Sequence, residues 1–292
     1  MKPAPFDYAA PASLDEALAL KAQHGDDAKF LAGGQSLIPA MNFRLVQAAM
    51  LVDVNGLRDL DFIRRADSGE VRIGALTRVR RVERDAVIKQ HAPLLHEAAP
   101  WIAHPQIRNR GTLGGSLAHA DPAAELPVIA VALGGRFRLQ SARGERWVNA
   151  DDFFKGFFTT ELTSDEMLVE AALPPLSART GAAFTELARR SGDYAMLGVA
   201  AVITLDDQGV CRDVRLVYLN AGPGPINARH AAGLLKGQAP SPAAFEAAAE
   251  MAAQNEIEPM GSVHASPEYQ RHLARVLTRR ALKTALERAN TM

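Results

Sequence analysis

Two glycine-rich segments contain the residue types that bind phosphate groups. The first is Gly-Gly-Gln-Ser at residues 33–36, and the second is Gly-Thr-Leu-Gly-Gly-Ser at residues 111–116. Glycine lacks a Cβ atom, so its backbone can adopt positive φ and approach a ligand closely. Successive N–H groups then face one anion-binding concavity, and the hydroxyls of Ser36, Thr112 and Ser116 add donors. The two segments therefore predict a diphosphate site that needs no cationic side chain.

Several other kinds of site lack their sequence motifs. No Gly-x-x-x-x-Gly-Lys-Ser/Thr and no Gly-x-Gly-x-x-Gly segment occurs, which argues against P-loop and Rossmann sites. The histidines have no metal-ligand spacing and no Gly-x-Ser-x-Gly elbow is present, so we expect neither a metal site nor an α/β-hydrolase. Asp121 and Glu125 are four residues apart, and we interpret them as surface charges of a helix. Because glycine pairs also form structural turns, spacing alone leaves the function open.

The composition is that of an ordinary globular protein. The 292 residues are 48% hydrophobic and 23% charged, with 33 basic and 33 acidic side chains, and this length suggests two domains, each with its own core. Zero net charge gives no electrostatic reason to bind nucleic acid or an anionic membrane. The single cysteine, Cys211, excludes a disulfide framework and cysteine-ligated metal within this chain. Without a spanning apolar stretch or an N-terminal signal region, we expect a cytoplasmic protein.

Short strands and helices must position the two glycine segments. Ser13 and Glu16 form a capping-box pattern for a helix that ends near Gly25. A strand at 28–31 then leads directly into the first segment. Further expected elements are strands over 51–54, 71–75, 137–139 and 167–173. Residues 78–103 are expected to be mostly helical, with Pro93 and Pro100 marking interruptions or starts.

Residues 173–177 are the best candidate for a linker. Beyond them, three strand-like runs follow one another, and the second and third are joined by a hairpin turn at 206–209. The predicted elements of this part are strands over 182–189, 194–205 and 210–219 and helices over 241–254 and 267–288. The chain is therefore predicted to be an α+β protein.

Taken in order, these segments resemble the FAD-binding medium subunit of molybdenum hydroxylases, the family of carbon monoxide dehydrogenase and xanthine dehydrogenase. The matching stretches are residues 5–8, 13–17, 32–37, 105–116, 121–127, 153–156 and 192–195. Each stretch is moderately specific, and together they cover almost the whole chain. The resemblance implies a vanillyl-alcohol-oxidase (PCMH-type) FAD-binding domain over 1–176, with subdomains of about 1–55 and 56–176. A C-terminal domain over 177–292 would contain a three-stranded antiparallel sheet and helices.

The resemblance also implies roles for single residues. The residues that would wrap the FAD diphosphate are Ala32, Gly33, Gly34, Gln35, Ser36, Leu37, Thr112, Leu113, Gly114, Gly115 and Ser116. Those that would line the adenine or ribityl region are Ile102, Ala103, Ile107 and Asp121. Leu162, Asp193 and Tyr194 would lie by the isoalloxazine ring, where none would act on the organic substrate. A tyrosine on a turn between strands can cover one ring face, although it can equally anchor the next strand.

The function implied by the resemblance is electron transfer within a complex. The substrate would be oxidised at a molybdopterin in a large subunit. Electrons would pass through [2Fe–2S] clusters of a small subunit to FAD, the one cofactor expected in this chain, and then to NAD⁺, a quinone or O₂. The clusters must belong to other chains, because this one has a single cysteine. The resemblance implies a dimer of heterotrimers, a heterohexamer.

Two alternatives remain open at this point. A stand-alone flavin oxidase or reductase of the same fold would tether the flavin or close a substrate pocket over its ring. His119, just after the second glycine segment, is the histidine placed for such a bond. A non-catalytic scaffold would instead retain the glycine segments as vestiges.

Overall fold

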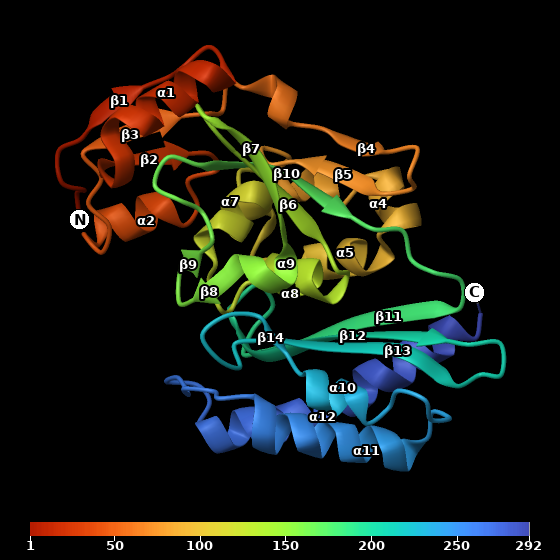
Figure 1. The fold of residues 1–292 in the computed structure, drawn as a ribbon. Coiled ribbons are helices and arrows are strands. Elements are labelled where there is room, and N and C mark those ends of the chain that lie inside the picture. The colour runs from red at the N-terminus through yellow and green to blue at the C-terminus, as the bar shows by residue number, and fades with distance from the viewer. Residues whose placement is uncertain (292) are drawn as a thin grey trace.

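The first 55 residues build a small parallel sheet beside two helices (Figure 1). The computed structural model describes residues 1–291; Met292, the last residue of the predicted C-terminal domain, lies outside them. The elements are β1 (Asp7–Ala9), α1 (Leu14–His24), a 3-10 turn (Gly25–Asp27), β2 (Ala28–Leu31), α2 (Leu37–Asn42) and β3 (Met50–Asp53), with strand order β1-β3-β2. The predicted cap of α1 is confirmed, since Ser13 Oγ accepts from the N–H of Glu16 at 3.2 Å.

The next part of the chain forms a five-stranded antiparallel sheet in the order β4-β5-β10-β6-β7. Its strands are β4 (Ile63–Arg65), β5 (Val71–Gly74), β6 (Arg136–Ser141), β7 (Gly144–Asn149) and β10 (Met167–Leu173), and a hairpin of β8 (Phe154–Gly156) and β9 (Thr159–Thr160) lies beside it. The helices are α3 (Val79–Val82), α4 (Ala86–His91), α5 (Pro93–Ala98), α6 (Pro105–Arg108), α7 (Leu113–His119), α8 (Glu125–Ala132) and α9 (Ala150–Phe153), with 3-10 turns at Arg58–Leu60 and Ala99–Trp101.

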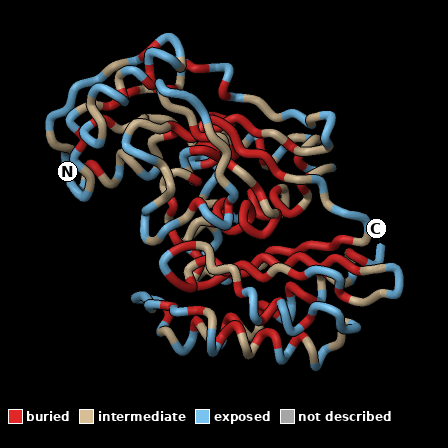
Figure 2. The backbone as a smooth tube through the Cα atoms, viewed as in Figure 1, coloured by how far each residue is buried: buried red, intermediate tan, exposed pale blue. Residues whose placement is uncertain are grey.

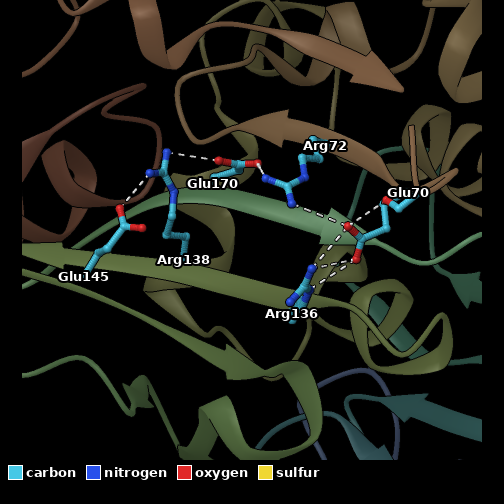
Figure 3. A network of polar contacts seen from close by, with 7 residues as sticks. Glu70, Arg72, Arg136, Arg138, Glu145 and Glu170 are labelled. Atoms are coloured by element: carbon cyan, nitrogen blue, oxygen red, sulfur yellow. Dashed lines mark hydrogen bonds and ion pairs between the residues drawn. The ribbon is translucent and has the colours of Figure 1, made fainter. Parts of the chain in front are cut away.

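One face of this sheet carries an ion-pair network (Figure 3). Glu170 on β10 is 1% exposed and lies between Arg72 of β5, at 3.2 Å, and Arg138 of β6, at 3.0 Å. The network continues to Glu70, Arg136 and Glu145. Side chains alternate between the two faces of a strand, so the neighbours Ile73 and Phe137 point the other way, into the apolar core. A buried carboxylate with two guanidinium partners links three adjacent strands.

After residue 176 the chain forms an antiparallel sheet covered by helices. Its elements are β11 (Thr180–Ala188), β12 (Ala195–Leu205), β13 (Cys211–Leu219), β14 (Ile226–Asn227), α10 (Arg229–Gly233), α11 (Pro242–Met251), a π-helix (Ala252–Glu256) and α12 (Pro267–Ala289). The three predicted strands and their hairpin are present, and β14 adds a fourth, two-residue strand that pairs with β13. No helix in residues 1–291 is both long and apolar enough to cross a membrane.

The sheet of β11–β14 is a middle layer between the part before residue 176 and helices α10, α11 and α12 (Figure 1). Ala182, Phe184 and Val202 face the core that also contains residues of α5, α8 and the five-stranded sheet. Leu197 and Ile203 face the opposite core, against α11 and α12. The three long strands are accordingly buried along most of their length (Figure 2). The expectation of a core for each domain is thus met by the smaller cores on either side of residue 176, but the largest core runs through that boundary.

Candidate functional site

The two glycine segments touch each other although they are far apart in the sequence. A Cβ atom built on Gly33 would lie 2.8 Å from the Cα of Gly111. Only a residue without a side chain allows two backbones to approach so closely. The two segments that were predicted to form one site are thus in contact.

The first glycine segment connects β2 to α2 and leaves its amides free. Gly34 has φ +71°, the left-handed conformation that glycine adopts without strain. Helix α2 starts immediately afterwards, and Ile38 N–H donates to the carbonyl of Gly34 at 3.1 Å. Within residues 1–291, the N–H groups of residues 33–36 find no hydrogen-bond acceptor. Such a row of unpaired donors suits an anion.

The second glycine segment differs from the prediction, because it is the start of a helix and its glycines do not have positive φ. Thr112 is the N-cap of α7, and its Oγ1 accepts from the N–H of Gly115 at 3.1 Å. Gly114 N–H donates to the carbonyl of Ala75 at 2.8 Å, and a Cβ on Gly114 would lie 2.5 Å from the Cβ of Ala75. Close packing, not a left-handed turn, requires glycine here.

Two cavities meet at the contact between the segments. One has a volume of about 460 Å³ and the other about 330 Å³. Both are lined by Gly33, Gly34, Gly115 and His119. The hollow is therefore a two-part groove whose middle is formed by glycine backbone and His119, a shape that fits a long ligand with a charged centre.

All but one of the predicted site residues line this groove. Those in the larger cavity, besides the shared glycines, are Ala32, Leu37, Gly114 and Leu162. Those in the smaller cavity are Gln35, Ser36, Ile102, Ala103, Ile107, Thr112, Ser116, Asp121, Asp193 and Tyr194. Leu162 and Tyr194 therefore lie in different parts of the groove. Leu113 lines neither cavity, because its side chain packs in the core and its N–H donates to the carbonyl of Thr77 at 2.9 Å.

The larger cavity is also lined by two lysines that were not among the predicted site residues. Lys29 and Lys21 line it beside Asp26. The ammonium group of Lys21 donates to the carbonyls of Gly25, at 2.6 Å, and Ala28, at 2.7 Å. Lys29 therefore offers a cation at the cavity wall, whereas Lys21 mainly ties the end of α1 to β2.

Arg108 holds the wall of the smaller cavity in place. Its buried guanidinium donates to the carbonyls of Ile102, at 2.9 Å, and Ala103, at 3.0 Å, and pairs with Glu83 at 2.9 Å. Ala103 has φ +44°, an unfavourable conformation for a residue with a side chain. The arginine contacts compensate for this strain and fix residues 102 and 103 at the groove.

Tyr194 lies on the turn between β11 and β12, as predicted. Its side chain lines the smaller cavity and is 73% exposed. Gly192, two residues earlier, has φ +85° and lies against the imidazole of His104. The phenol ring is thus held at the cavity mouth by one glycine turn, with solvent on its other side.

The interpretation of Asp121 and Glu125 as surface charges of one helix is wrong. Asp121 precedes α8, and its Oδ1 accepts from the N–H of Ala123 at 2.9 Å. Glu125 opens α8, lines the smaller cavity and is buried. The uninterrupted apolar run after Glu125 was the sequence signal for this burial.

A second buried carboxyl lies near Glu125. Burial raises the pKa of Glu125 to about 7. Burial and the nearby Glu125 raise the pKa of Glu186, on β11, to about 8, and Glu186 Oε2 has no hydrogen-bond partner within residues 1–291. At neutral pH both carboxyls are therefore protonated to a much larger extent than exposed glutamates are.

His119 occupies the junction of the two cavities. Its ring packs on that of Phe158, with centroids 5.1 Å apart and planes inclined by 48°. Burial lowers the pKa of His119, and the carboxylate of Asp121 opposes this shift only in part. A neutral imidazole beside the backbone donors can either donate or accept one hydrogen bond there. Among residues 1–291, no cluster of three or more His, Cys, Asp or Glu side chains could hold a metal ion.

Comparison with known proteins identifies the class. The family described as FAD binding domain in molybdopterin dehydrogenase matches residues 4–176, and the CO dehydrogenase flavoprotein C-terminal domain matches residues 182–285. The chain is 45% identical to the 6-hydroxypseudooxynicotine dehydrogenase complex subunit alpha of Paenarthrobacter nicotinovorans, over 99% of this chain and 97% of that one.

Two solved structures are similar over nearly the whole length. Carbon monoxide dehydrogenase from Hydrogenophaga pseudoflava superimposes with a TM-score of 0.95 at 39% identity and covers 99% of both chains. Quinoline 2-oxidoreductase from Pseudomonas putida 86 gives 0.92 at 36% identity, again with 99% of both chains covered. The chain belongs to the FAD-binding medium subunits of molybdenum hydroxylases of the carbon monoxide dehydrogenase and xanthine dehydrogenase type. It is an oxidoreductase subunit, and its cofactor is FAD.

Proposed function

We propose that this chain transfers electrons within a multi-subunit molybdenum hydroxylase, from [2Fe–2S] clusters of a small subunit to an external acceptor. Bound FAD supplies one- and two-electron redox chemistry. The observation that carries the proposal is the groove itself: two cavities joined where the backbones of two glycine segments touch, with unpaired N–H groups at residues 33–36. A dinucleotide has this form, with two bulky ends and a charged diphosphate between them.

The roles proposed for the chain's own residues follow from their chemistry. The N–H groups of residues 33–36 and the hydroxyl of Ser116 would donate to the diphosphate, whereas the Thr112 hydroxyl already caps α7. Ile102 and Ile107 would contact the cofactor through apolar surface, and Asp121 would accept a hydrogen bond from it. Tyr194 would cover the flavin ring at the mouth of the smaller cavity, and Leu162 would contact the cofactor from the larger one.

We also propose domain boundaries at residues 1–176 and 177–292, with subdomains of about 1–55 and 56–176. In support, the family matches cover residues 4–176 and 182–285. Each sheet also lies within one proposed unit: β1-β3-β2 in the first, the five-stranded sheet in the second and β11–β14 in the third. One apolar core joins the second unit to the third, and another joins the first unit to the second, so these units are parts of one folded body.

Partners are proposed from the relatives. One is named a subunit of a dehydrogenase complex, and two are named medium chain or medium subunit. We propose that this chain likewise binds a large molybdopterin subunit and a small [2Fe–2S] subunit in a dimer of heterotrimers. The external acceptor would be NAD⁺, a quinone or O₂. The cytoplasmic location remains a prediction from the sequence.

The test begins with the purified chain and a FAD titration followed by quenching of flavin fluorescence. We expect saturable binding of one FAD per chain, release of the flavin on acid precipitation, and reduction of the flavin only when the large and small subunits and their substrate are added. Flavin that stays with the acid-precipitated protein, together with substrate turnover by the chain alone, would instead support a stand-alone oxidase tethered at His119. A chain that takes up no FAD would refute both functions.

A further inference from the structure

Behind the two glycine segments, Asn55 and Arg78 form a chain of hydrogen bonds from one to the other. The side-chain amide of Asn55 donates to the carbonyl of Ala32 at 2.8 Å, and its Oδ1 accepts from Arg78 Nη2 at 2.6 Å. The other terminal nitrogen of Arg78, Nη1, donates to the carbonyl of Arg110. Ala32 directly precedes the first glycine pair, and Arg110 directly precedes the second segment. We call this pair of side chains the Asn55–Arg78 brace.

The chemistry of the groups fixes the direction of these bonds. A guanidinium only donates hydrogen bonds, so Asn55 must turn its Oδ1 toward Arg78 and its NH₂ toward the carbonyls. Asp53 supports the same orientation, because its Oδ1 accepts from Asn55 Nδ2 at 2.7 Å and from Asn55 N–H at 2.9 Å. The hydroxyl of Tyr8 in turn donates to Asp53 Oδ2 at 2.6 Å. The amide of Asn55 is therefore held from two sides.

The contact at Ala32 determines where the next amide points. In a trans peptide the C=O of one residue and the N–H of the next lie in one plane and point in opposite directions. The carbonyl of Ala32 is bound by Asn55, which lines neither cavity, so the N–H of Gly33 is directed away from Asn55. The second contact holds the Arg110 carbonyl, the same atom that packs on Gly33.

Asn55 and Arg78 come from opposite sides of the proposed subdomain boundary near residue 55. The sequence places Arg78 at the start of an alternating run of arginines that is typical of a solvated helix face. Arg78 departs from that pattern, because it is half-buried and makes its contacts with Asn55 and Arg110. Its neighbour Arg81, on α3, is exposed and pairs with Asp61 at 2.8 Å.

We propose that Asn55 and Arg78 are positioning residues for the cofactor: the brace holds the two glycine segments at the spacing that FAD requires, without touching FAD itself. This inference rests on the proposed FAD site. It assigns to Arg78 a bridging role that needs two donors at a fixed separation. A positive charge alone would not fulfil this role, because the lysine ammonium is a compact point donor without the planar fork of arginine.

The test measures FAD binding by the full-length chain and by R78M, R78K, N55A and the N55A/R78M double variant. R81M is the matched control. It removes the ion pair of an arginine on α3, the helix that begins directly after Arg78, and touches neither glycine segment. We expect Kd for FAD to rise about tenfold or more in R78M and in N55A, and to change less than about twofold in R81M. The double variant should bind FAD about as weakly as the single variant with the lower affinity, because both changes break the same connection between the glycine segments.

The lysine variant separates a brace from an electrostatic role. We expect R78K to bind FAD about as weakly as R78M, while the apo forms of R78K, N55A and R81M unfold within a few degrees of one another. Near-normal affinity of R78K for FAD would overturn the brace. So would a rise in Kd in the double variant equal to the product of the rises in the two single variants. If the unmodified chain binds FAD normally and R78M and N55A have the same Kd for FAD as that chain, the brace would be overturned and the proposed function would stand. Failure of the unmodified chain to bind FAD would overturn both the brace and the proposed function.

Discussion

A Cβ atom on Gly33 would lie 2.4 Å from the carbonyl oxygen of Arg110. Real Cβ atoms do not come so close to a backbone oxygen, and the contacting atom belongs to the backbone, so no side-chain rotation could relieve the clash. The two glycine segments thus meet at Gly33 and Gly111, and the two cavities of the proposed FAD groove share this part of their lining.

Replacing Gly33 by alanine should therefore separate the segments. We expect G33A to weaken FAD binding about 100-fold or more, because the added methyl group must displace backbone on which the diphosphate site depends. The measurement is a FAD titration, with circular dichroism to confirm folding. G56A is the control, since a Cβ on Gly56 meets no atom within 4 Å. Equal affinity in G33A and G56A would contradict the backbone contact as a determinant of the site.

Replacing Tyr194 by alanine should uncover the flavin without releasing it. Most of the phenol ring faces solvent, so its loss removes little packing. We expect Kd for FAD to change less than about threefold and the reaction of the reduced flavin with O₂ to become at least about twofold faster. Stopped-flow absorbance measures this reoxidation. Y269A, a loss of an exposed tyrosine on α12, provides the comparison. Identical reoxidation in Y194A and the unmodified protein would exclude the covering role.

The buried carboxyl of Glu186 should make stability depend on pH. Its pKa rises to about 8 on folding, well above the ordinary value, so the folded protein retains a proton that the unfolded chain releases. The free energy of unfolding should therefore fall as pH increases from about 4.5 to about 8. In E186Q this decrease in the free energy of unfolding should be about 1–3 kcal/mol smaller than in the unmodified protein. Urea unfolding at about pH 5.5 and about pH 8.5 measures the difference.

The exposed Glu287 supplies the control for this experiment, because E287Q changes a carboxyl that is not buried. We expect E287Q to retain the pH dependence of the unmodified protein. A pH dependence that E186Q leaves unaltered would show that Glu186 is not the group responsible.

Thr112 should contribute both to α7 and to the groove. Its Oγ1 caps the N–H of Gly115, and T112V, which has nearly the same shape, leaves that donor unpaired. We expect a loss of about 1 kcal/mol in the free energy of unfolding, with a smaller loss in T112S, which keeps the hydroxyl. Chemical denaturation of the three proteins measures both values. A T112V protein as stable as T112S would contradict the capping role.

Local patterns predicted much of the fold. The cap at Ser13, the strand that enters the first glycine segment and the three consecutive strands after residue 176 all depend on signals within a few residues. The mostly helical stretch expected over 78–103 consists of several short helices: Pro93 starts one of them, as predicted, and Asp85 caps another that the sequence pattern did not indicate. Short elements such as β1, β4 and β14 were missed, since three or fewer residues carry almost no periodicity.

The groove was predicted from the glycine segments and the family resemblance, but its supporting contacts were not. Spacing cannot show that Asn55 reaches Arg78, or that Glu186 on β11 comes to lie near Glu125. The second glycine segment was misread for a related reason: the left-handed turn and the tight helix contact both require glycine, and only the position of Ala75 distinguishes them. These relations depend on tertiary packing, which a single sequence does not encode locally.

Because Phe184 and Val202 pack into the same apolar interior as the helices before residue 176, the two parts of the chain bury apolar surface against each other. A fragment ending at residue 176 would expose apolar side chains to water and would tend to aggregate. Heating the intact subunit should accordingly produce one cooperative melting transition. Recombination between related genes at this boundary would be tolerated only when both parts come from the same gene or when the apolar surfaces that they bury against each other are complementary.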